Sequence, residues 1–236
     1  MASTFGDGPF DTICLDAGGT LVWPNWERVR DALAAQGITV ETASLAAADP
    51  RVRRSLDEQH LIASSTDQSR AWSFFDSVLT IAGVELTPGA RRALSHVEEY
   101  QRTMNLWEHV PEFVVPSLVE LRRRGYKLVV ISNANGTVRQ AFRRLGLFDL
   151  VDVIVDSAEQ GFEKPDRRLF DAALRIAGAE RSRALHVGDI YHVDVTGARA
   201  AGLTPVLVDE AGLYADADCH RITSIAELPA LLEQFT

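Results

Sequence analysis

The amino-acid sequence predicts an α/β protein that has a doubly wound parallel sheet and an inserted all-helical subdomain. Two observations predict this class. Over most of the chain, short apolar runs alternate with stretches of helical spacing, and strands that alternate with helices are typical of a parallel sheet. One long block behind the first apolar run shows helical spacing alone, which indicates an insertion into the α/β pattern.

The first apolar run, Thr12 to Leu15, predicts a short buried strand that ends before Gly18 and Gly19. Asp16 therefore lies at the carboxyl end of this strand, where ligand-binding crevices form in open parallel sheets. A carboxylate at such a place can accept a phosphoryl group as a covalent intermediate. Taken alone, this aspartate is explained equally well as a helix cap or a turn residue without any chemistry.

The segment from Trp26 to about Arg102 shows helical signals and no convincing strand. Apolar residues recur there at helical spacing, and the pair Thr87-Pro88 is typical of a helix start. Its aromatic residues, at positions 72, 74 and 75, are expected in the core of the subdomain. We therefore predict a helical subdomain over residues 22–110, and an α/β core over residues 1–21 and 111–236.

After Pro111 the alternation of helices and strands resumes. A helix that ends with basic residues before Gly125 leads into a strand from Leu128 to Ser132. The remaining expected elements are helices over about 137–145, 166–177, 193–201 and 225–235, and strands over 153–156, 184–188 and 204–208.

The amino-acid composition limits the possible partners and location of the protein. The formal net charge is -9 and the pI is about 5.2, which argues against nucleic acid or an anionic membrane as the main partner. No apolar run approaches the roughly 18 residues that a membrane span needs, and the first residues lack the pattern of a signal peptide. The two cysteines predict no disulfide framework. We expect a cytoplasmic protein that is a monomer or a homodimer.

Polar residues follow three of the expected strands. Asp16 follows the first strand, Ser132 and Asn133 close the second, and Asp189 and Asp194 follow a later one. Because the carboxyl ends of parallel strands meet at one edge of a sheet, we expect these side chains to face one crevice.

This set of side chains suits phosphoryl transfer. Carboxylates from separate segments can hold Mg²⁺ and leave positions for water and a phosphate oxygen. Lys164, on a loop before a helix, can reach the same place. With Ser132 it would supply positive charge and a hydrogen-bond donor to the phosphate oxygens. Each residue alone has a structural explanation, and it is their joint arrangement that favours a site.

Four segments, in this order and spacing, resemble the sequence motifs of the haloacid dehalogenase-like (HAD) hydrolase superfamily: Asp16-Ala-Gly-Gly-Thr20-Leu, Ser132-Asn133, Lys164-Pro165-Asp166, and Gly188-Asp189 with Asp194. The resemblance implies a Rossmann-like catalytic core over 1–21 and 111–236. It also implies that residues 22–110 form a helical cap of the C1 type, inserted between the first and second motifs.

The resemblance further implies a phosphatase-type hydrolase that forms an aspartyl-phosphate at Asp16, with Mg²⁺ as cofactor and a small soluble phosphate ester as substrate. Ser132 and Lys164 would be catalytic phosphate ligands, and Asp194 would support either the metal site or Lys164. The other implied site residues are Gly19, Thr20 and Asn133 for substrate phosphate, and Asp16, the Gly18 carbonyl, Asp189 and Asp194 for the metal.

One position departs from the family's pattern. The phosphatases of this family usually carry a second aspartate two positions after the nucleophile, where it protonates the leaving alcohol and later activates water, and Gly18 stands there instead. General acid–base assistance is typically worth about 10²–10⁴-fold, so we expect slow hydrolysis of alkyl phosphates. Either another residue supplies the proton, or the substrate has a good leaving group, or turnover is lost.

Four residues are candidates for the missing proton donor, and each also has a plain structural explanation: Tyr191, His192, His60 and His96.

Two alternatives remain open. An L-2-haloacid dehalogenase displaces halide, which needs neither a proton nor a metal, so Gly18 would suit it. That branch carries a Ser-x-Asn pattern where this chain has Gly188-Asp189, and we rank it second. The other alternative is a catalytically weak phosphate-binding module, against which the intact Asp16 and Lys164 argue.

Overall fold

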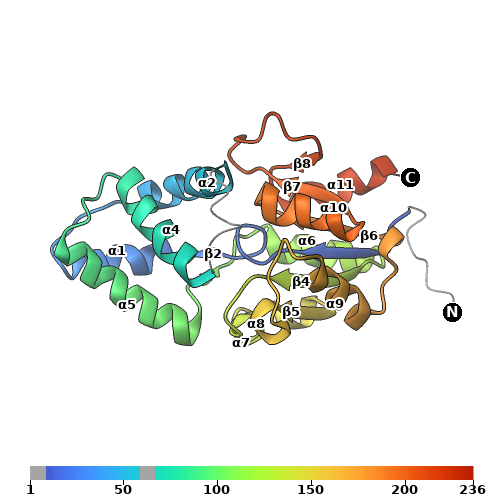
Figure 1. The fold of residues 1–236 in the computed structure, drawn as a ribbon, viewed down its shortest axis with the longest axis horizontal. Coiled ribbons are helices and arrows are strands. Elements are labelled where there is room, and N and C mark those ends of the chain that lie inside the picture. The colour runs from blue at the N-terminus through green and yellow to red at the C-terminus, as the bar shows by residue number, and fades with distance from the viewer. Residues whose placement is uncertain (1–8, 59–66, 236) are drawn as a thin grey trace. The chain divides into compact units, whose positions relative to one another are not determined.

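The computed structural model describes residues 9–58 and 67–235. The chain divides into two compact units (Figure 1). One, which we call the α/β unit, comprises Met1–Trp23 and His109–Thr236, and the other, which we call the helical unit, comprises Pro24–Glu108. Among the described helices, none combines the length and the apolar character that crossing a membrane requires.

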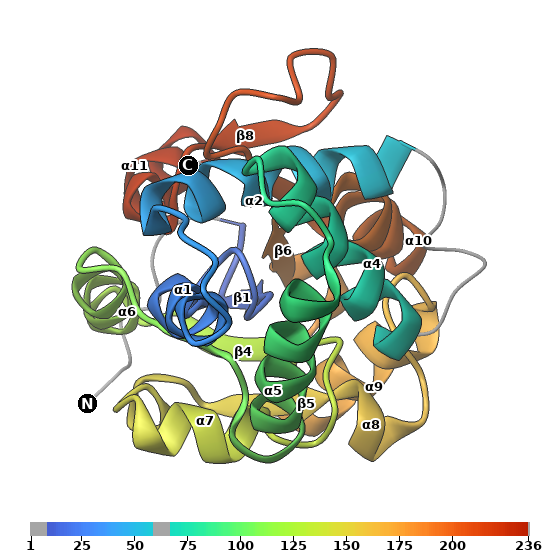
Figure 2. The same ribbon diagram turned by 90° about the vertical axis from the view of Figure 1, so that its left-hand side faces the viewer.

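The α/β unit is built on a six-stranded sheet in the order β5-β4-β1-β6-β7-β8, in which every pairing is parallel. Its strands are β1 (Thr12–Leu15), β4 (Lys127–Ser132), β5 (Val153–Asp156), β6 (Ala184–Gly188), β7 (Thr204–Val208) and β8 (His220–Ile222). Thr12 of β1 is opposite Lys127 on one side and Ala184 on the other. The first strand of the sequence is therefore central in the sheet (Figure 2).

Both faces of the sheet are covered, as expected for parallel strands that consist of near-continuous apolar runs. Val129 and Ile131 of β4 pack in one cluster with Phe170 of a following helix. Leu128 and Val130, which alternate with them and so point the other way, are equally buried. The helices of this unit are α6 (Val114–Arg123), α7 (Val138–Arg144), α8 (Ser157–Gln160), α9 (Arg167–Ala177), α10 (Gly197–Ala201) and α11 (Leu228–Leu232).

The strands expected over 12–15, 128–132, 153–156, 184–188 and 204–208 are confirmed, and β4 begins one residue earlier. Strand β8 was not expected. It has three residues, of which His220 and Arg221 are exposed, so the sequence offers no apolar run there.

Two expected helices differ from the structure. Where a helix was expected over 193–201, the chain forms a π-helical turn, Tyr191–Thr196, and then the short helix α10. The helix expected over 225–235 is broken into two 3-10 turns on either side of α11. Pro229 lies in the first turn of α11, where a residue without an N–H group is tolerated. The α-helix therefore begins at Leu228 instead of at Ile225.

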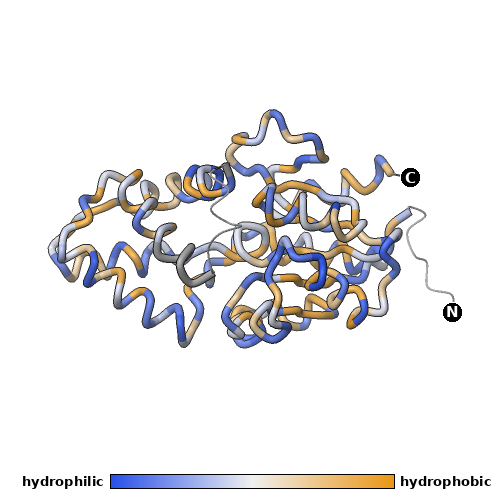
Figure 3. The backbone as a smooth tube through the Cα atoms, in the orientation of Figure 1, coloured by the Kyte–Doolittle hydropathy of each residue, from blue (hydrophilic) through white to orange (hydrophobic). Residues whose placement is uncertain are grey.

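The helical unit contains α1 (Trp26–Ala34), α2 (Thr42–Glu58), α4 (Asp67–Ile81) and α5 (Pro88–Met104). It has its own apolar core, in which Trp26 contacts Phe74 and Phe75. The expectation that these aromatic residues form a core is confirmed for Phe74 and Phe75, whereas the side chain of Trp72 lies outside the described part of the chain. Hydrophobic and hydrophilic residues alternate along α5, as an amphipathic helix requires (Figure 3).

Two short strands connect the units along the chain. β2 (Trp23–Pro24) and β3 (Trp107–His109) pair with each other as a separate two-stranded sheet. The chain thus leaves the α/β unit and returns to it through adjacent strands.

Glu108 joins the two ends of the helical unit. Its carboxylate, whose side chain is 10% exposed, accepts hydrogen bonds from Asn25 (3.0 Å), Arg28 (3.1 Å) and Tyr100 (2.7 Å). Burial acts to raise the pKa of Glu108, but these three donors outweigh it and hold the pKa below its ordinary value.

A depressed pKa makes the stability of the helical unit depend on pH. The contribution of Glu108 is complete above the unfolded pKa of about 4.3 and is lost as the pH falls through the lower folded pKa. We expect Glu108→Gln to lower the free energy of unfolding at pH 7 by about 1–3 kcal/mol, and to reduce the acid dependence of stability below pH 4.3. Urea unfolding followed by circular dichroism at several pH values measures both effects. An unchanged acid dependence in the variant would contradict this assignment.

Candidate active site

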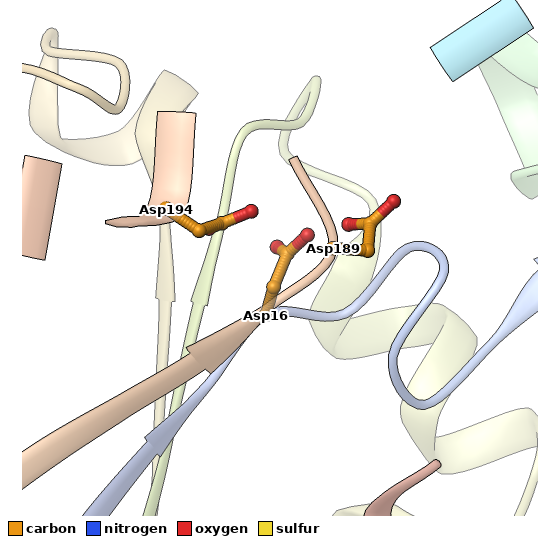
Figure 4. Close-up of side chains that lie close together, drawn as sticks. All are labelled: Asp16, Asp189 and Asp194. Atoms are coloured by element: carbon orange, nitrogen blue, oxygen red, sulfur yellow. The ribbon is translucent and has the colours of Figure 1, made fainter. Parts of the chain in front are cut away.

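Three aspartates meet at the carboxyl end of the sheet (Figure 4). Asp16 directly follows β1, and its backbone N–H donates to the carbonyl of Val187 on β6 (2.8 Å). Asp189 follows β6, and Asp194 lies in the π-helical turn beyond it. One carboxylate oxygen from each of the three lies within 4.8 Å of the others. The structure therefore brings together the three aspartates that were expected to share one edge of the sheet.

Lys164 places a buried ammonium between two of these carboxylates. Its Nζ lies 2.7 Å from Asp16 Oδ1 and 2.8 Å from Asp194 Oδ1, and the residue is 2% exposed. Lys164 comes from the loop between α8 and α9, far in the sequence from Asp16. A lysine buried without carboxylate partners would be strongly destabilising, so the position of this side chain depends on both aspartates.

The backbone of Lys164 is held by Asn133. The Asn133 side-chain Nδ2 donates to the Lys164 carbonyl (2.9 Å), and its Oδ1 accepts from the Lys164 N–H (2.7 Å). Asn133 therefore fixes the loop that carries the lysine, and its predicted contact with substrate phosphate stays a prediction. Its neighbour Ser132 is buried at the end of β4, on the same edge of the sheet as Asp16.

Asp194 accepts hydrogen bonds on both carboxylate oxygens. Oδ1 contacts Lys164 Nζ and also the Nε2 of His186 (2.9 Å), while Oδ2 accepts from the N–H of Ile190 (3.1 Å). The backbone of Gly188 lies so close that an added Cβ would be 2.1 Å from Asp194 Cγ. The sequence interpretation did not include His186, although a histidine inside the apolar run 184–188 signals a buried polar group that needs a partner.

Burial and charge shift the pKa values of these groups in different directions. Burial raises the pKa of the Asp16 carboxyl, the Lys164 ammonium opposes this, and the charge of Asp194 adds to it. Burial opposes ionisation of Asp194 too, but Lys164 and His186 outweigh it and hold its pKa below the ordinary value. The pKa of Lys164 is raised, because Asp16 and Asp194 outweigh the effect of burial. Asp194 and Lys164 thus form a buried ion pair beside Asp16.

The turn after Asp16 brings its backbone back to the strand. The N–H groups of Leu21 and Val22 both donate to the carbonyl of Ala17 (2.8 and 2.9 Å). Gly19 adopts the left-handed backbone that this turn requires, with φ of 68°, and Gly18 does not. Thr20 is fully buried, and among the residues that the structure describes its Oγ1 has no hydrogen-bond partner.

The oxygen atoms at this edge fit a hard divalent cation. Mg²⁺ prefers carboxylate and carbonyl oxygens, and the carboxylates of Asp16 and Asp189 lie close together here. Asp194 already holds donors on both oxygens, and these contacts favour support of Lys164 over direct metal binding. The donor set therefore fits the expected metal without Asp194.

One candidate proton donor is engaged elsewhere. The hydroxyl of Tyr191 donates to Asp218 (2.5 Å) and accepts from Arg199 (3.0 Å). The hydrogen bond to Asp218 raises the pKa of Tyr191. Of the other candidates, His192 lies in the π-helical turn and His96 on α5, whereas His60 lies outside the described residues.

Two further aspartates end strands but serve the fold. Asp156, at the end of β5, accepts hydrogen bonds from the backbone N–H groups of Gly136 (3.0 Å) and Ala158 (3.0 Å). Asp209, after β7, accepts from the N–H groups of Leu213 (2.7 Å) and Tyr214 (3.1 Å). Backbone amides hold both of these carboxylates, and Asp209 also pairs with the Arg221 guanidinium (3.0 Å). Asp16 differs because it faces the Lys164 ammonium and two other carboxylates.

Several known proteins are similar in sequence to this chain. A family model for haloacid dehalogenase-like hydrolases matches residues 10–202. The glyceraldehyde 3-phosphate phosphatase of Methanothermobacter thermautotrophicus is 39% identical over 104 residues, which are 43% of this chain and 46% of the relative. The ribulose-1,5-bisphosphate 5-phosphatase of Halopiger xanaduensis is 33% identical over 139 residues, or 58% of this chain and 56% of the relative. The chain thus spans about half the length of these curated relatives.

Solved structures share the fold over nearly the whole chain. The crystal structure of the HAD-hydrolase YfnB from Bacillus subtilis, bound to magnesium, superposes with a TM-score of 0.69 at 19% identity and covers 94% of this chain and 98% of that one. A 2-haloacid dehalogenase from Pseudomonas syringae superposes with a TM-score of 0.60 at 24% identity, over 96% and 100% of the two chains. Since the family model matches most of the sequence, this chain belongs to the haloacid dehalogenase-like hydrolases.

Proposed function

We propose that this protein is a Mg²⁺-dependent phosphatase that hydrolyses a small soluble phosphate ester through an aspartyl-phosphate at Asp16. The observation that carries the proposal is the environment of Asp16. Its carboxylate lies at the end of the central strand β1, 2.7 Å from a buried ammonium and beside a second carboxylate, Asp189. A carboxylate held next to fixed positive charge is suited to attack a phosphorus atom whose oxygens need neutralising.

In the proposed reaction, an oxygen of Asp16 attacks the phosphorus atom and the bond from phosphorus to the leaving oxygen breaks. Water then attacks the phosphorus of the aspartyl-phosphate, which releases inorganic phosphate and restores the Asp16 carboxylate. Lys164 and Ser132 would stabilise the charge on the phosphate oxygens in both steps. Gly19, Thr20 and Asn133, on the adjoining loops, complete the proposed phosphate-binding set.

In this proposal, Asp16, Asp189 and the carbonyl of Gly18 hold the metal. Bound Mg²⁺ would neutralise charge on the phosphate and orient it toward Asp16. Asp194, which accepts from Lys164, His186 and Ile190, is assigned to holding Lys164 in place.

Residues 22–110 are proposed as a cap that closes over a small substrate and excludes bulk water. The names of the phosphatase relatives, which act on glyceraldehyde 3-phosphate and ribulose-1,5-bisphosphate, support a small-molecule phosphate as the substrate class. We also propose that the protein is cytoplasmic and is a monomer or a homodimer.

The nucleophile is tested by Asp16→Asn. The amide is a far weaker nucleophile than the carboxylate, so we expect phosphate release from p-nitrophenyl phosphate to fall by at least about 10³-fold, with the circular dichroism spectrum unchanged. Asp209→Asn is the matched control, because it makes the same change at the end of β7, where the carboxylate serves the fold. It should keep its activity. An unchanged rate in Asp16→Asn would exclude the mechanism.

The metal is tested by its removal. Phosphate release from p-nitrophenyl phosphate and acetyl phosphate should stop when Mg²⁺ is chelated and return when it is restored. In Asp189→Asn, which loses a charged oxygen ligand, the Mg²⁺ concentration for half-maximal rate should rise at least about 10-fold. Metal-independent release of chloride from L-2-chloropropionate would instead favour the dehalogenase alternative. If neither phosphate nor chloride is released in any assay, the alternative of a phosphate-binding module is favoured.

The role of Gly18 is tested by Gly18→Asp. Gly18 does not adopt a left-handed backbone, so its conformation is open to residues with a side chain. An aspartate there would supply the acid that the family's phosphatases usually carry. Alkyl phosphates depend on that acid much more than aryl phosphates. We expect the rate on glycerol phosphate to rise at least about 10-fold relative to the rate on p-nitrophenyl phosphate. Gly18→Asn, of nearly equal size but without an acidic proton, should show no such change. Equal effects of both variants on both substrates would refute this explanation.

A further inference from the structure

A buried histidine lies directly behind the proposed active site. His186 is the third residue of β6, is fully buried, and stands opposite Cys14 of β1 in the sheet. The ring of Phe170 on α9 packs edge-on against it, with ring centroids 5.0 Å apart and an interplanar angle of 87°. The surroundings of His186 are therefore apolar on the side of α9.

His186 has one hydrogen-bond partner among the described residues. Its Nε2 lies 2.9 Å from Asp194 Oδ1, and its Nδ1 is buried with no partner in that part of the chain. A carboxylate paired with an ammonium only accepts hydrogen bonds, so Nε2 must carry the proton and donate it. In a neutral ring, Nδ1 is then a bare acceptor in an apolar core.

Fold stability alone does not account for this histidine. A buried nitrogen without a partner is unfavourable, and a leucine would fill similar space against Phe170 without that cost. What a leucine lacks is the N–H group aimed at Asp194. The contact with Asp194 is thus the property of His186 that an apolar residue cannot replace.

We propose that His186 is a positioning residue, which fixes the Asp194 carboxylate so that Lys164 is directed at Asp16. The same oxygen, Asp194 Oδ1, accepts from His186 Nε2 and from Lys164 Nζ. The N–H of Ile190 donates to the other oxygen, Oδ2. Together, the two donors hold the Asp194 carboxylate in one orientation, and this orientation sets the position of the Lys164 ammonium. The effect of His186 on turnover rests on the proposed function of Asp16.

The test compares His186→Leu with His186→Gln in the full-length protein. The leucine removes the donor and keeps the apolar volume, whereas the glutamine amide can still donate at a similar reach. We expect kcat/KM for p-nitrophenyl phosphate at saturating Mg²⁺ to fall about 10–100-fold in His186→Leu, and His186→Gln to recover most of that loss. The leucine removes a partnerless nitrogen but also one donor to the buried Asp194 carboxylate. These effects oppose each other, so its urea unfolding midpoint should stay close to that of the parent.

Phe170→Leu is the matched control, since it alters packing against the same ring without touching the hydrogen bond. It should lower the unfolding midpoint and change kcat/KM little. Loss of activity in step with loss of stability in all three variants would show that His186 only fills the core and would overturn the proposal. Full activity in His186→Leu would overturn it as well.

A measurement without turnover separates this inference from the proposed function. In protein with ¹⁵N-labelled histidine, the His186 ring, assigned by its absence in His186→Gln, should carry its proton on Nε2, and this proton should exchange slowly with solvent. In Asp194→Leu, which removes the acceptor, the signal should shift and exchange faster. If the parent protein has no activity but shows these signals, the proposed function fails while the contact stands. A proton on Nδ1 would refute the positioning role whether or not the protein is active.

Discussion

The arrangement at the edge of the sheet depends on one buried ammonium. Lys164 is 2% exposed and lies between Asp16 and Asp194. Removing an ammonium from water is costly, and the cost is recovered only when carboxylates approach it with good geometry. The two aspartates meet this condition. Other hydrogen bonds limit the movement of Lys164 and Asp194. The side chain of Asn133 bonds to the Lys164 backbone, and the N–H of Ile190 donates to Asp194.

This dependence distinguishes Asp16 from other strand-end aspartates in the same sheet. Aspartates follow β1, β5 and β7 in similar positions. Those at the ends of β5 and β7 accept hydrogen bonds from backbone amides of the next turn, and Asp209 also pairs with the Arg221 guanidinium. Asp16 instead faces a side-chain ammonium and two other carboxylates. An ammonium shared with a second buried carboxylate, and not the strand-end position, distinguishes Asp16 from these two aspartates.

The sequence predicts the five longer strands because each is an apolar run bounded by polar or glycine residues. It does not predict the π-helical turn at Tyr191–Thr196, because apolar spacing alone cannot distinguish this winding from an α-helix. The residues of the site are found at strand ends and by resemblance, but their contacts are not. Two examples are the hydrogen bonds of Asn133 to the Lys164 backbone and of His186 to Asp194. Both depend on tertiary packing that brings distant segments together.

The central position of β1 makes its strand pairings remote in the sequence. Thr12 pairs with Lys127 and Ala184, and the whole helical unit lies between the first two of these residues in the sequence. Closing so long a loop carries an entropy cost that local contacts do not repay, and such pairings form slowly. The helices of the inserted unit, whose contacts are local, can form first and shorten the effective loop. Because Asp16 lies at the end of β1 and Lys164 lies far along the chain, we expect their contact to form only with the remote strand pairings, late in folding.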